Sequence, residues 1–193
     1  LHETNIRLGG EWIETRLLSS GPRTNPWFRE CSMRIIEKGD LVSFDTDLIG
    51  PYGYCSDMSR SWLCGDKPSD EQRRLYAAAF EQIESNIAVL KAGRTFLEVA
   101  EQCWPIPEEF LSNRYSVSMH GVGLADEYPS IKHSVDVAGN AYDGVIEAGM
   151  TLCVESFIGS YGGREGVKLE EQVIVTEAGI ERMSTYPYEI DWL

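Results

Sequence analysis

The sequence has little positive charge, no long apolar run and no paired cysteine spacing. Its 193 residues hold 17 Lys and Arg against 31 Asp and Glu, a net charge of −14. Nucleic-acid binding depends on basic patches that displace counterions, and a membrane-spanning helix needs about 20 apolar residues. The start, LHETNIRLGG, also lacks the basic and then apolar layout of a signal peptide. We therefore expect a soluble protein with no nucleic-acid or membrane partner.

The five cysteines are odd in number and show no CxxC spacing. Scattered thiols are typical of a reduced, cytoplasmic protein and argue against a disulfide framework or a zinc ribbon. The chain is long enough for one domain with a substantial core. Because it starts without Met, we expect it to be the C-terminal part of a longer protein.

Local patterns predict strands, then two helices, then strands again. Ser69 and Gln72 have the spacing of a capping box at the start of a long helix, which Gly93 is placed to stop. Thr95 opens a second helix that extends to about Cys103. The other predicted elements are a hairpin of residues 31–37 and 41–49 around Lys38-Gly39-Asp40, a strand over 59–64 closed by the turn Gly65-Asp66-Lys67-Pro68, a helical turn over 108–111, and strands over 116–120, 151–158 and 169–176. This order indicates an α+β fold.

Acidic residues stand inside the predicted strands, where Asp and Glu are uncommon. Asp45 and Asp47 are two residues apart, so their side chains share one face of a strand. Asp57, Glu155 and Glu170 are likewise embedded among apolar residues. One such acid can be exposed or paired with a basic residue, but a buried set of five is best satisfied by a cation between its members.

His120 lies between glycine-rich and apolar residues in SMHGVGLADEYP, where backbone and ligand can approach closely. An oxygen-rich site with one imidazole suits Mn, Fe or Co better than a closed structural zinc site. We therefore expect a two-metal centre built from the five acids and this histidine.

Four segments carry a resemblance to a known family: FDTDLIGPYGYCSDMSRSW, MHGVGL, GMTLCVES and GVKLEEQVIVT, in this order. Together they resemble the creatinase/prolidase/methionine-aminopeptidase (M24, pita-bread) metalloenzymes. The resemblance implies a pita-bread α+β fold, of which residues 1–193 form most of the C-terminal metal-binding catalytic domain, with an N-terminal domain upstream of this chain. It also implies a dinuclear centre whose ligands are Asp45, Asp47, Asp57, His120, Glu155 and Glu170.

Two departures from the peptidases of that family affect the expected reaction. The segment GPRTNPWF holds Trp27 but no histidine, and Asp126 occupies the place of a second histidine after the HGVGL run. These features resemble the DddP-type dimethylsulfoniopropionate (DMSP) lyases. That resemblance implies iron-dependent cleavage of DMSP to dimethyl sulfide and acrylate by a cytoplasmic homodimer from a marine bacterium. It makes Asp126 the catalytic base, with Tyr115, His120 and Asp126 in contact with the substrate.

Other interpretations of the same residues stay open. Asp126 could be a solvated loop residue or a helix cap, and Tyr115 a core aromatic. An amide hydrolase of the same fold, such as an aminopeptidase, prolidase or creatinase, would need a replacement for the absent imidazoles, for which His133 is the candidate besides His2. A non-catalytic binding module is disfavoured because such proteins usually lose their metal ligands. Mn, Co and Zn are alternatives to iron.

Overall fold

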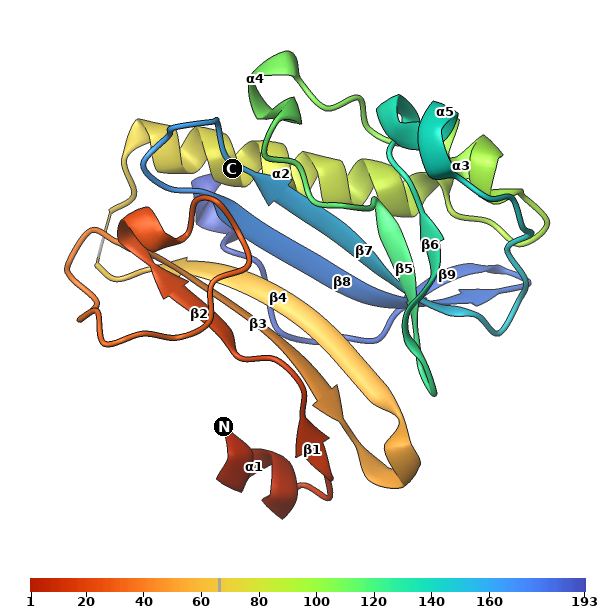
Figure 1. The fold of residues 1–193 in the computed structure, drawn as a ribbon, viewed down its shortest axis with the longest axis horizontal. Coiled ribbons are helices and arrows are strands. Elements are labelled where there is room, and N and C mark those ends of the chain that lie inside the picture. The colour runs from red at the N-terminus through yellow and green to blue at the C-terminus, as the bar shows by residue number, and fades with distance from the viewer. Residues whose placement is uncertain (66) are drawn as a thin grey trace.

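Two antiparallel sheets meet at the centre of the computed structural model, which describes residues 1–65 and 67–193 (Figure 1). The first sheet is built on β3 (Leu41–Ile49), which pairs with β4 (Cys55–Leu63) along one edge and with β1 (Trp12–Ile13) and β2 (Leu17–Ser20) along the other. The second has the order β6-β5-β7-β8-β9, with β5 (Met119–Val122), β6 (Asp126–Ile131), β7 (Thr151–Ile158), β8 (Val167–Thr176) and β9 (Gly179–Arg182).

Helices cover one side of the second sheet (Figure 1). The longest, α2 (Asp70–Val89), packs on β7 and β8 and buries Leu75, Ala79 and Ile83 against the apolar residues of these strands. The remaining helices are α1 (His2–Arg7), α3 (Phe96–Gln102), α4 (Glu108–Leu111) and α5 (Val137–Asn140), with short 3₁₀ turns η1 (Gly21–Arg23), η2 (Pro51–Gly53), η3 (Ser134–Asp136) and η4 (Ile190–Trp192). No helix in the described ranges is long and apolar enough to cross a membrane.

The predicted helix starts are confirmed. The Ser69 hydroxyl accepts a hydrogen bond from the Gln72 amide at 3.2 Å, and the Gln72 side chain accepts one from the Ser69 amide at 2.8 Å. Thr95 and Glu98 make the same reciprocal pair at the start of α3. The long helix ends at Val89, a few residues before the glycine that we expected to stop it.

The predicted hairpin of residues 31–37 and 41–49 is wrong in its first half. The strand expected over 41–49 is confirmed as β3, with the predicted bounds. Residues 31–37, all described, form no strand, and Met33 and Ile35 are 96% and 79% exposed. The reason is that β4 occupies one edge of β3 over its whole length while β1 and β2 occupy the other. No edge of β3 is left for a further partner.

The other strand predictions are correct in type but not always in extent. Strand β7 has the predicted bounds, β8 begins two residues earlier, β4 is longer at its start, and the strand expected over 116–120 lies at Met119–Val122. The sequence analysis does not predict strands β1, β2, β6 and β9. Asp66, in the turn expected after β4, lies outside the described residues.

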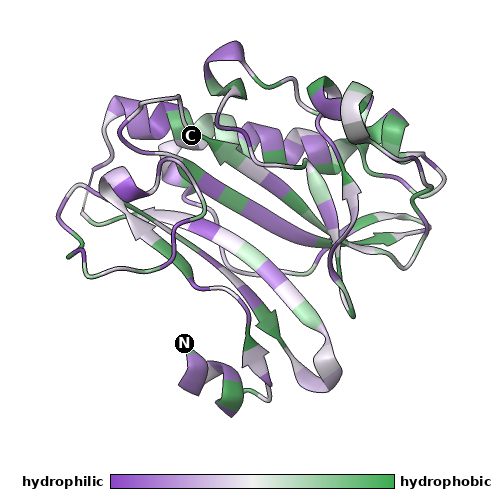
Figure 2. Ribbon diagram, viewed as in Figure 1, coloured by the Kyte–Doolittle hydropathy of each residue, from purple (hydrophilic) through white to green (hydrophobic). Residues whose placement is uncertain are grey.

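The seam between the sheets is polar. Here β4 lies against β8, and Figure 2 shows hydrophilic residues within both strands. The Ser61 hydroxyl links the two strands by donating to the Lys168 carbonyl at 2.8 Å and accepting from the Lys168 amide at 3.2 Å. The acids of the predicted site lie along this seam.

Candidate metal centre

Cross-strand pairing brings the predicted ligands together. Asp47 lies directly opposite Asp57 in the β3–β4 ladder, and Glu155 lies opposite Glu170 in the β7–β8 ladder. His120 enters from β5, the other neighbour of β7. Five of the six predicted side chains are buried, and Asp47 is half-buried. Each strand therefore contributes polar side chains to one point at the seam.

The Nε2 atom of His120 is the focus of one group of acids. It lies 3.5 Å from Asp57 Oδ2, 3.3 Å from Glu155 Oε1 and 3.6 Å from Glu170 Oε1. Ligand atoms that share a cation at 2.0–2.2 Å in tetrahedral geometry are about 3.4 Å apart. The three distances from Nε2 are therefore those expected for ligands of a common divalent ion.

The other ring nitrogen of His120 supports this orientation. Nδ1 lies 3.2 Å from the Gly121 carbonyl oxygen, a separation at which it can donate a hydrogen bond to that oxygen. A proton on Nδ1 leaves the lone pair of Nε2 free toward the acids, as metal-binding histidines require.

A second group consists of Asp45, Asp47 and Asp57, each of which offers an oxygen within 4.8 Å of the others. The Thr15 hydroxyl donates to Asp47 Oδ2 at 2.6 Å and so orients that carboxylate. Among the described residues, three buried carboxylate oxygens have no hydrogen-bond partner: Asp45 Oδ1, Asp57 Oδ1 and Glu170 Oε1. Unpartnered buried oxygens are costly, and a pair of metal ions would satisfy them.

Lys168 is a member of the site that the sequence analysis missed. It is fully buried, and its ammonium group lies 2.6 Å from Ser59 Oγ, 2.6 Å from Glu155 Oε2 and 3.2 Å from Glu170 Oε2. Asp45 Oδ2 is 3.7 Å away. In the ionised form that binds metal, the five carboxylates carry five negative charges, and Lys168 beside them carries one positive charge. The remaining four negative charges match two divalent cations.

Burial and crowding shift the pKa values of these acids. Burial raises the pKa of Asp45 to about 8, and burial followed by the charges of Glu170 and Asp45 raises that of Asp57 well above its ordinary value. Burial also acts to raise the pKa of Glu170, but Lys168 and then His120 reverse this effect and lower it. Burial would lower the pKa of His120, yet the adjacent carboxylates of Glu155 and Glu170 raise it to about 12. Lys168 alone therefore does not keep all of these carboxylates ionised, and additional positive charge, such as that of metal ions, would be needed to do so.

Cys153 is a second residue that was missed. It lies opposite His120 in the β5–β7 ladder, and its sulfur is within 4.8 Å of ligand atoms of Asp57, His120 and Glu170. The sequence indicates only five scattered thiols, and all five cysteines are free. Its two-residue spacing from Glu155 places both side chains on one face of β7, which is the signal that could have identified it.

Asp126 begins β6, so it is not a helix cap. Its Oδ1 lies 3.8 Å from Nδ1 of His120, and its side chain is 15% exposed, which leaves it reachable from solvent. Burial, partly opposed by His120 and supported by Asp47, raises its pKa to about 6. A carboxylate in this state can exchange a proton near neutral pH.

The aromatic candidates lie on the Lys168 side of the site. Tyr115, in the loop before β5, and Trp27 are both buried, with ring centroids 5.0 Å and 5.7 Å from the Lys168 ammonium group. The exposed ring of Phe28 stacks on Tyr115 at 5.3 Å. His133 does not replace a lost imidazole at the centre, because it is buried and its Nε2 donates to the Tyr115 carbonyl at 2.9 Å.

The sequence matches metallopeptidase family M24 over residues 2–177. It is 49% identical over 193 residues to dimethylsulfoniopropionate lyase DddP of Roseovarius nubinhibens and 46% identical over 190 residues to the lyase of the same name from Roseobacter denitrificans. Each alignment covers 98% of this chain but only 43% and 42% of those proteins. The dipeptidase PepE from Mycobacterium ulcerans superposes with a TM-score of 0.79 at 27% identity, over 95% of this chain and 48% of that one. The expected pita-bread fold is confirmed, and the chain spans less than half the length of these relatives.

Proposed function

The chain belongs to metallopeptidase family M24, and from this premise we propose that it is the metal-binding catalytic part of a DMSP lyase. The proposed reaction is a β-elimination that converts DMSP into dimethyl sulfide and acrylate. Two relatives of high identity are named as DMSP lyases. Because the chain covers less than half of each, the activity of the complete protein is inferred from them by similarity.

One observation favours elimination over peptide hydrolysis: the acid–base group beside His120 is the carboxylate of Asp126. The other two histidines of the sequence are His2, at the exposed start of α1, and the buried His133. Neither offers an imidazole to protonate a leaving amine. A sulfonium group leaves as a neutral sulfide and needs no proton, so a site with a single carboxylate base suffices.

In the proposed mechanism, Asp126 removes a proton from the carbon next to the substrate carboxylate. The electron pair of that C–H bond forms the new C=C bond, and the C–S bond breaks as its pair leaves with dimethyl sulfide. Tyr115 and His120 contact the substrate and hold this carbon near Asp126. Two divalent ions held by the five acids and His120 would act as a Lewis acid for the charge that develops on the carboxylate, worth several kcal/mol.

The proposal extends to the identity of the metal, the oligomeric state and the cellular location. We expect iron at both positions, with Mn, Co or Zn as alternatives, because oxygen ligands and one imidazole accommodate each of these ions. We also propose a homodimer, from the resemblance to DddP-type lyases. Five free cysteines agree with a reducing cytoplasmic location.

The test is to reconstitute the complete gene product with Fe(II) and add DMSP. We expect dimethyl sulfide in the headspace and an equal amount of acrylate in solution. Parallel incubation with X-Pro dipeptides should release no proline. Peptide cleavage without gas release would contradict the lyase assignment and favour the amide hydrolase.

A further inference from the structure

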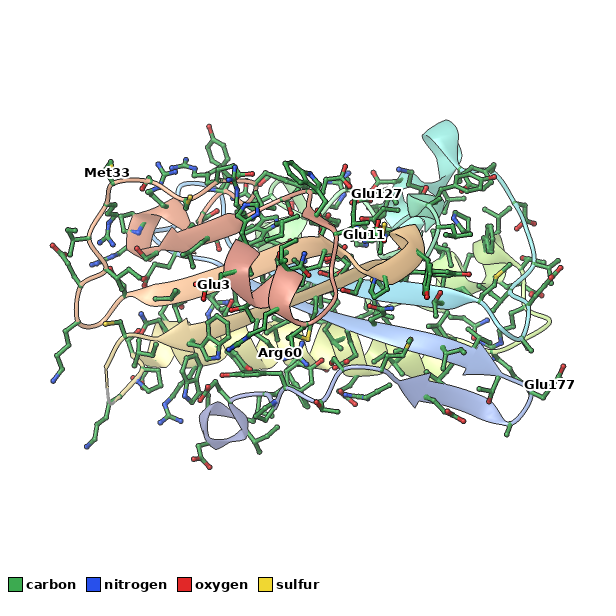
Figure 3. All side chains as sticks on the ribbon, turned by 90° about the horizontal axis from the view of Figure 1, so that it is seen from below. Glu3, Glu11, Met33, Arg60, Glu127 and Glu177 are labelled. Carbon is green, nitrogen blue, oxygen red and sulfur yellow. The ribbon has the colours of Figure 1, made fainter. Side chains whose placement is uncertain are left out.

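We infer that Arg60 is a positioning residue for the metal centre and that the C-terminal segment Met183–Trp192 holds it in place. This inference rests on the proposed metal centre. Arg60 lies on β4, and its side chain points away from the acids, to the opposite side of the seam. Figure 3 views this side of the molecule, with Arg60 between β4 and the C-terminal segment.

The guanidinium group forms hydrogen bonds with the backbone of two residues whose side chains face the metal centre. Its Nη1 donates to the carbonyl oxygens of Ser59, at 3.0 Å, and Glu170, at 2.5 Å. On the metal side of the seam, the Ser59 hydroxyl donates to Glu170 Oε2 at 2.8 Å. Strands β4 and β8 belong to different sheets. Arg60 therefore fixes the position of a predicted ligand in one sheet relative to its hydrogen-bond donor in the other.

The C-terminal segment supplies the remaining partners of Arg60. The Tyr186 carbonyl accepts from Nη2 at 2.9 Å and from Nε at 3.3 Å, and the ring of Tyr188 lies 4.1 Å from the guanidinium carbon. Nη2 also donates to Glu171 Oε2 at 3.1 Å. Arg60 and Glu171 are both nearly fully buried, at 2% and 1% exposure. Every N–H of the guanidinium thus has an acceptor, which fixes its orientation.

Glu171 is held by the same segment. Its carboxylate accepts hydrogen bonds from the Tyr188 hydroxyl, at 2.7 Å, and from the Ser184 hydroxyl. The segment is anchored in turn on α2, where the ring of Tyr188 lies against Phe80 and that of Trp192 against Tyr76. The C-terminus accordingly ends beside α2 in Figure 1. Because Glu171 follows Glu170 directly in β8, these contacts also restrict the backbone at the ligand position.

The decisive test replaces the ion pair by apolar residues, because exchanging both partners of a buried pair for hydrophobic side chains of similar volume is often neutral for stability, whereas removing one partner is strongly destabilising. In the double variant Arg60→Met/Glu171→Met, the packing is kept but the donors to the Ser59 and Glu170 carbonyls are lost. We expect its metal-free form to keep a native near-UV circular dichroism spectrum. Titration with Co(II), followed by the visible absorption of the bound ion, should give a dissociation constant at least about tenfold higher than that of the unaltered protein.

Tyr188→Phe provides a milder variant that removes only the hydroxyl bonded to Glu171, and we expect a rise of about threefold in the Co(II) dissociation constant. If the double variant does not fold, the Co(II) affinity of Tyr188→Phe tests the inference. The matched control is Arg74→Met, which breaks an exposed ion pair of α2 with Glu71 and Glu109 and should leave Co(II) affinity unchanged. Wild-type affinity in folded variants of Arg60 and Tyr188 would overturn the inference. Failure of the unaltered protein to bind Co(II) would instead contradict the metal centre itself.

Discussion

The ammonium group of Lys168 lies 2.6 Å from Oε2 of Glu155, whose other carboxylate oxygen lies 3.3 Å from Nε2 of His120. Glu170 shows the same division, with Oε2 toward Lys168 and Oε1 toward His120. Each glutamate therefore directs one carboxylate oxygen toward the Lys168 ammonium group and the other toward the position that suits a metal ion. Lys168 holds part of the carboxylate cluster together before any metal binds.

This arrangement predicts a stability effect of Lys168→Met in the metal-free protein. Removing one partner of a buried ion pair leaves uncompensated charge and typically costs about 3–5 kcal/mol. We expect a loss of that size in the free energy of unfolding, measured by urea denaturation in the presence of a chelator. Lys91→Met, at an exposed lysine, should change it by less than about 0.5 kcal/mol. Equal stability of both variants would show that Lys168 does not neutralise the cluster.

Asp57→Asn should have opposite effects on the metal-free and metal-loaded proteins. Burial and neighbouring acids raise the pKa of Asp57 because they disfavour its negative charge. Above the unfolded value of about 3.9 the unfolded state loses this proton more readily than the folded state, so the carboxyl lowers stability as the pH rises. The amide removes this charge, and we expect a higher melting temperature than that of the unaltered protein without metal. Binding at 100 times the dissociation constant adds about 2.7 kcal/mol to a protein that binds metal.

The measurement for Asp57→Asn is thermal unfolding at neutral pH, once with chelator and once with excess Mn(II). The unaltered protein should be stabilised by the metal, whereas the variant should not respond. A variant that is less stable without metal and still stabilised by Mn(II) would contradict the assignment of Asp57 as a ligand.

The sequence was sufficient to predict the α+β class and the capped helices, because these depend on local spacing. The acids that it proposes as ligands do lie together in the structure. The strand expected over 31–37 failed because strand pairing is decided by which edges of β3 are free, and this depends on distant segments. Lys168 was missed for a related reason. Its two-residue spacing from Glu170 indicates the same face of a strand, but its contact with Glu155 follows only from the β7–β8 register.

His133 predicts an acid sensitivity that is independent of the metal centre. Burial lowers its pKa to about 4, because the charged ring is poorly solvated there, although the hydrogen bond to the Tyr115 carbonyl acts in the opposite direction. The unfolded state, with a pKa of about 6.5, binds more protons between these values, so stability is lost as the pH falls from about 6.5 toward 4. The free energy of unfolding should fall by about 2–3 kcal/mol over this interval, since one pKa unit corresponds to about 1.4 kcal/mol.

Urea unfolding of the metal-free protein at several pH values measures this slope. His133→Gln keeps a donor for the carbonyl but does not titrate, and it should flatten the curve between about pH 6.5 and 4. His2→Gln, at the exposed start of α1, is the control and should leave the slope intact. An equally steep curve in His133→Gln would mean that other groups cause the acid sensitivity.

Asp126→Asn tests the proposed base. The amide keeps the shape of the side chain but cannot accept the proton, so we expect a loss of turnover of about 10²–10⁴-fold, the usual contribution of general base catalysis. Metal content, measured by elemental analysis, should stay at the level of the unaltered protein, since Asp126 is not among the residues clustered around His120 Nε2. Loss of metal in this variant would make Asp126 a ligand instead.

The dependence of the lyase reaction on pH follows from the pKa of the same residue. Burial raises the pKa of Asp126 to about 6, and a base acts only in its ionised form. The value of kcat/KM for DMSP should therefore be constant above that pKa and fall about tenfold for each pH unit below it. DMSP has no group that titrates between about pH 5 and 8, because a carboxylate loses its proton near pH 4 and a sulfonium carries none. A profile that stays flat down to about pH 5 would remove Asp126 from the proton transfer, since at that pH most of its carboxyl groups would be protonated.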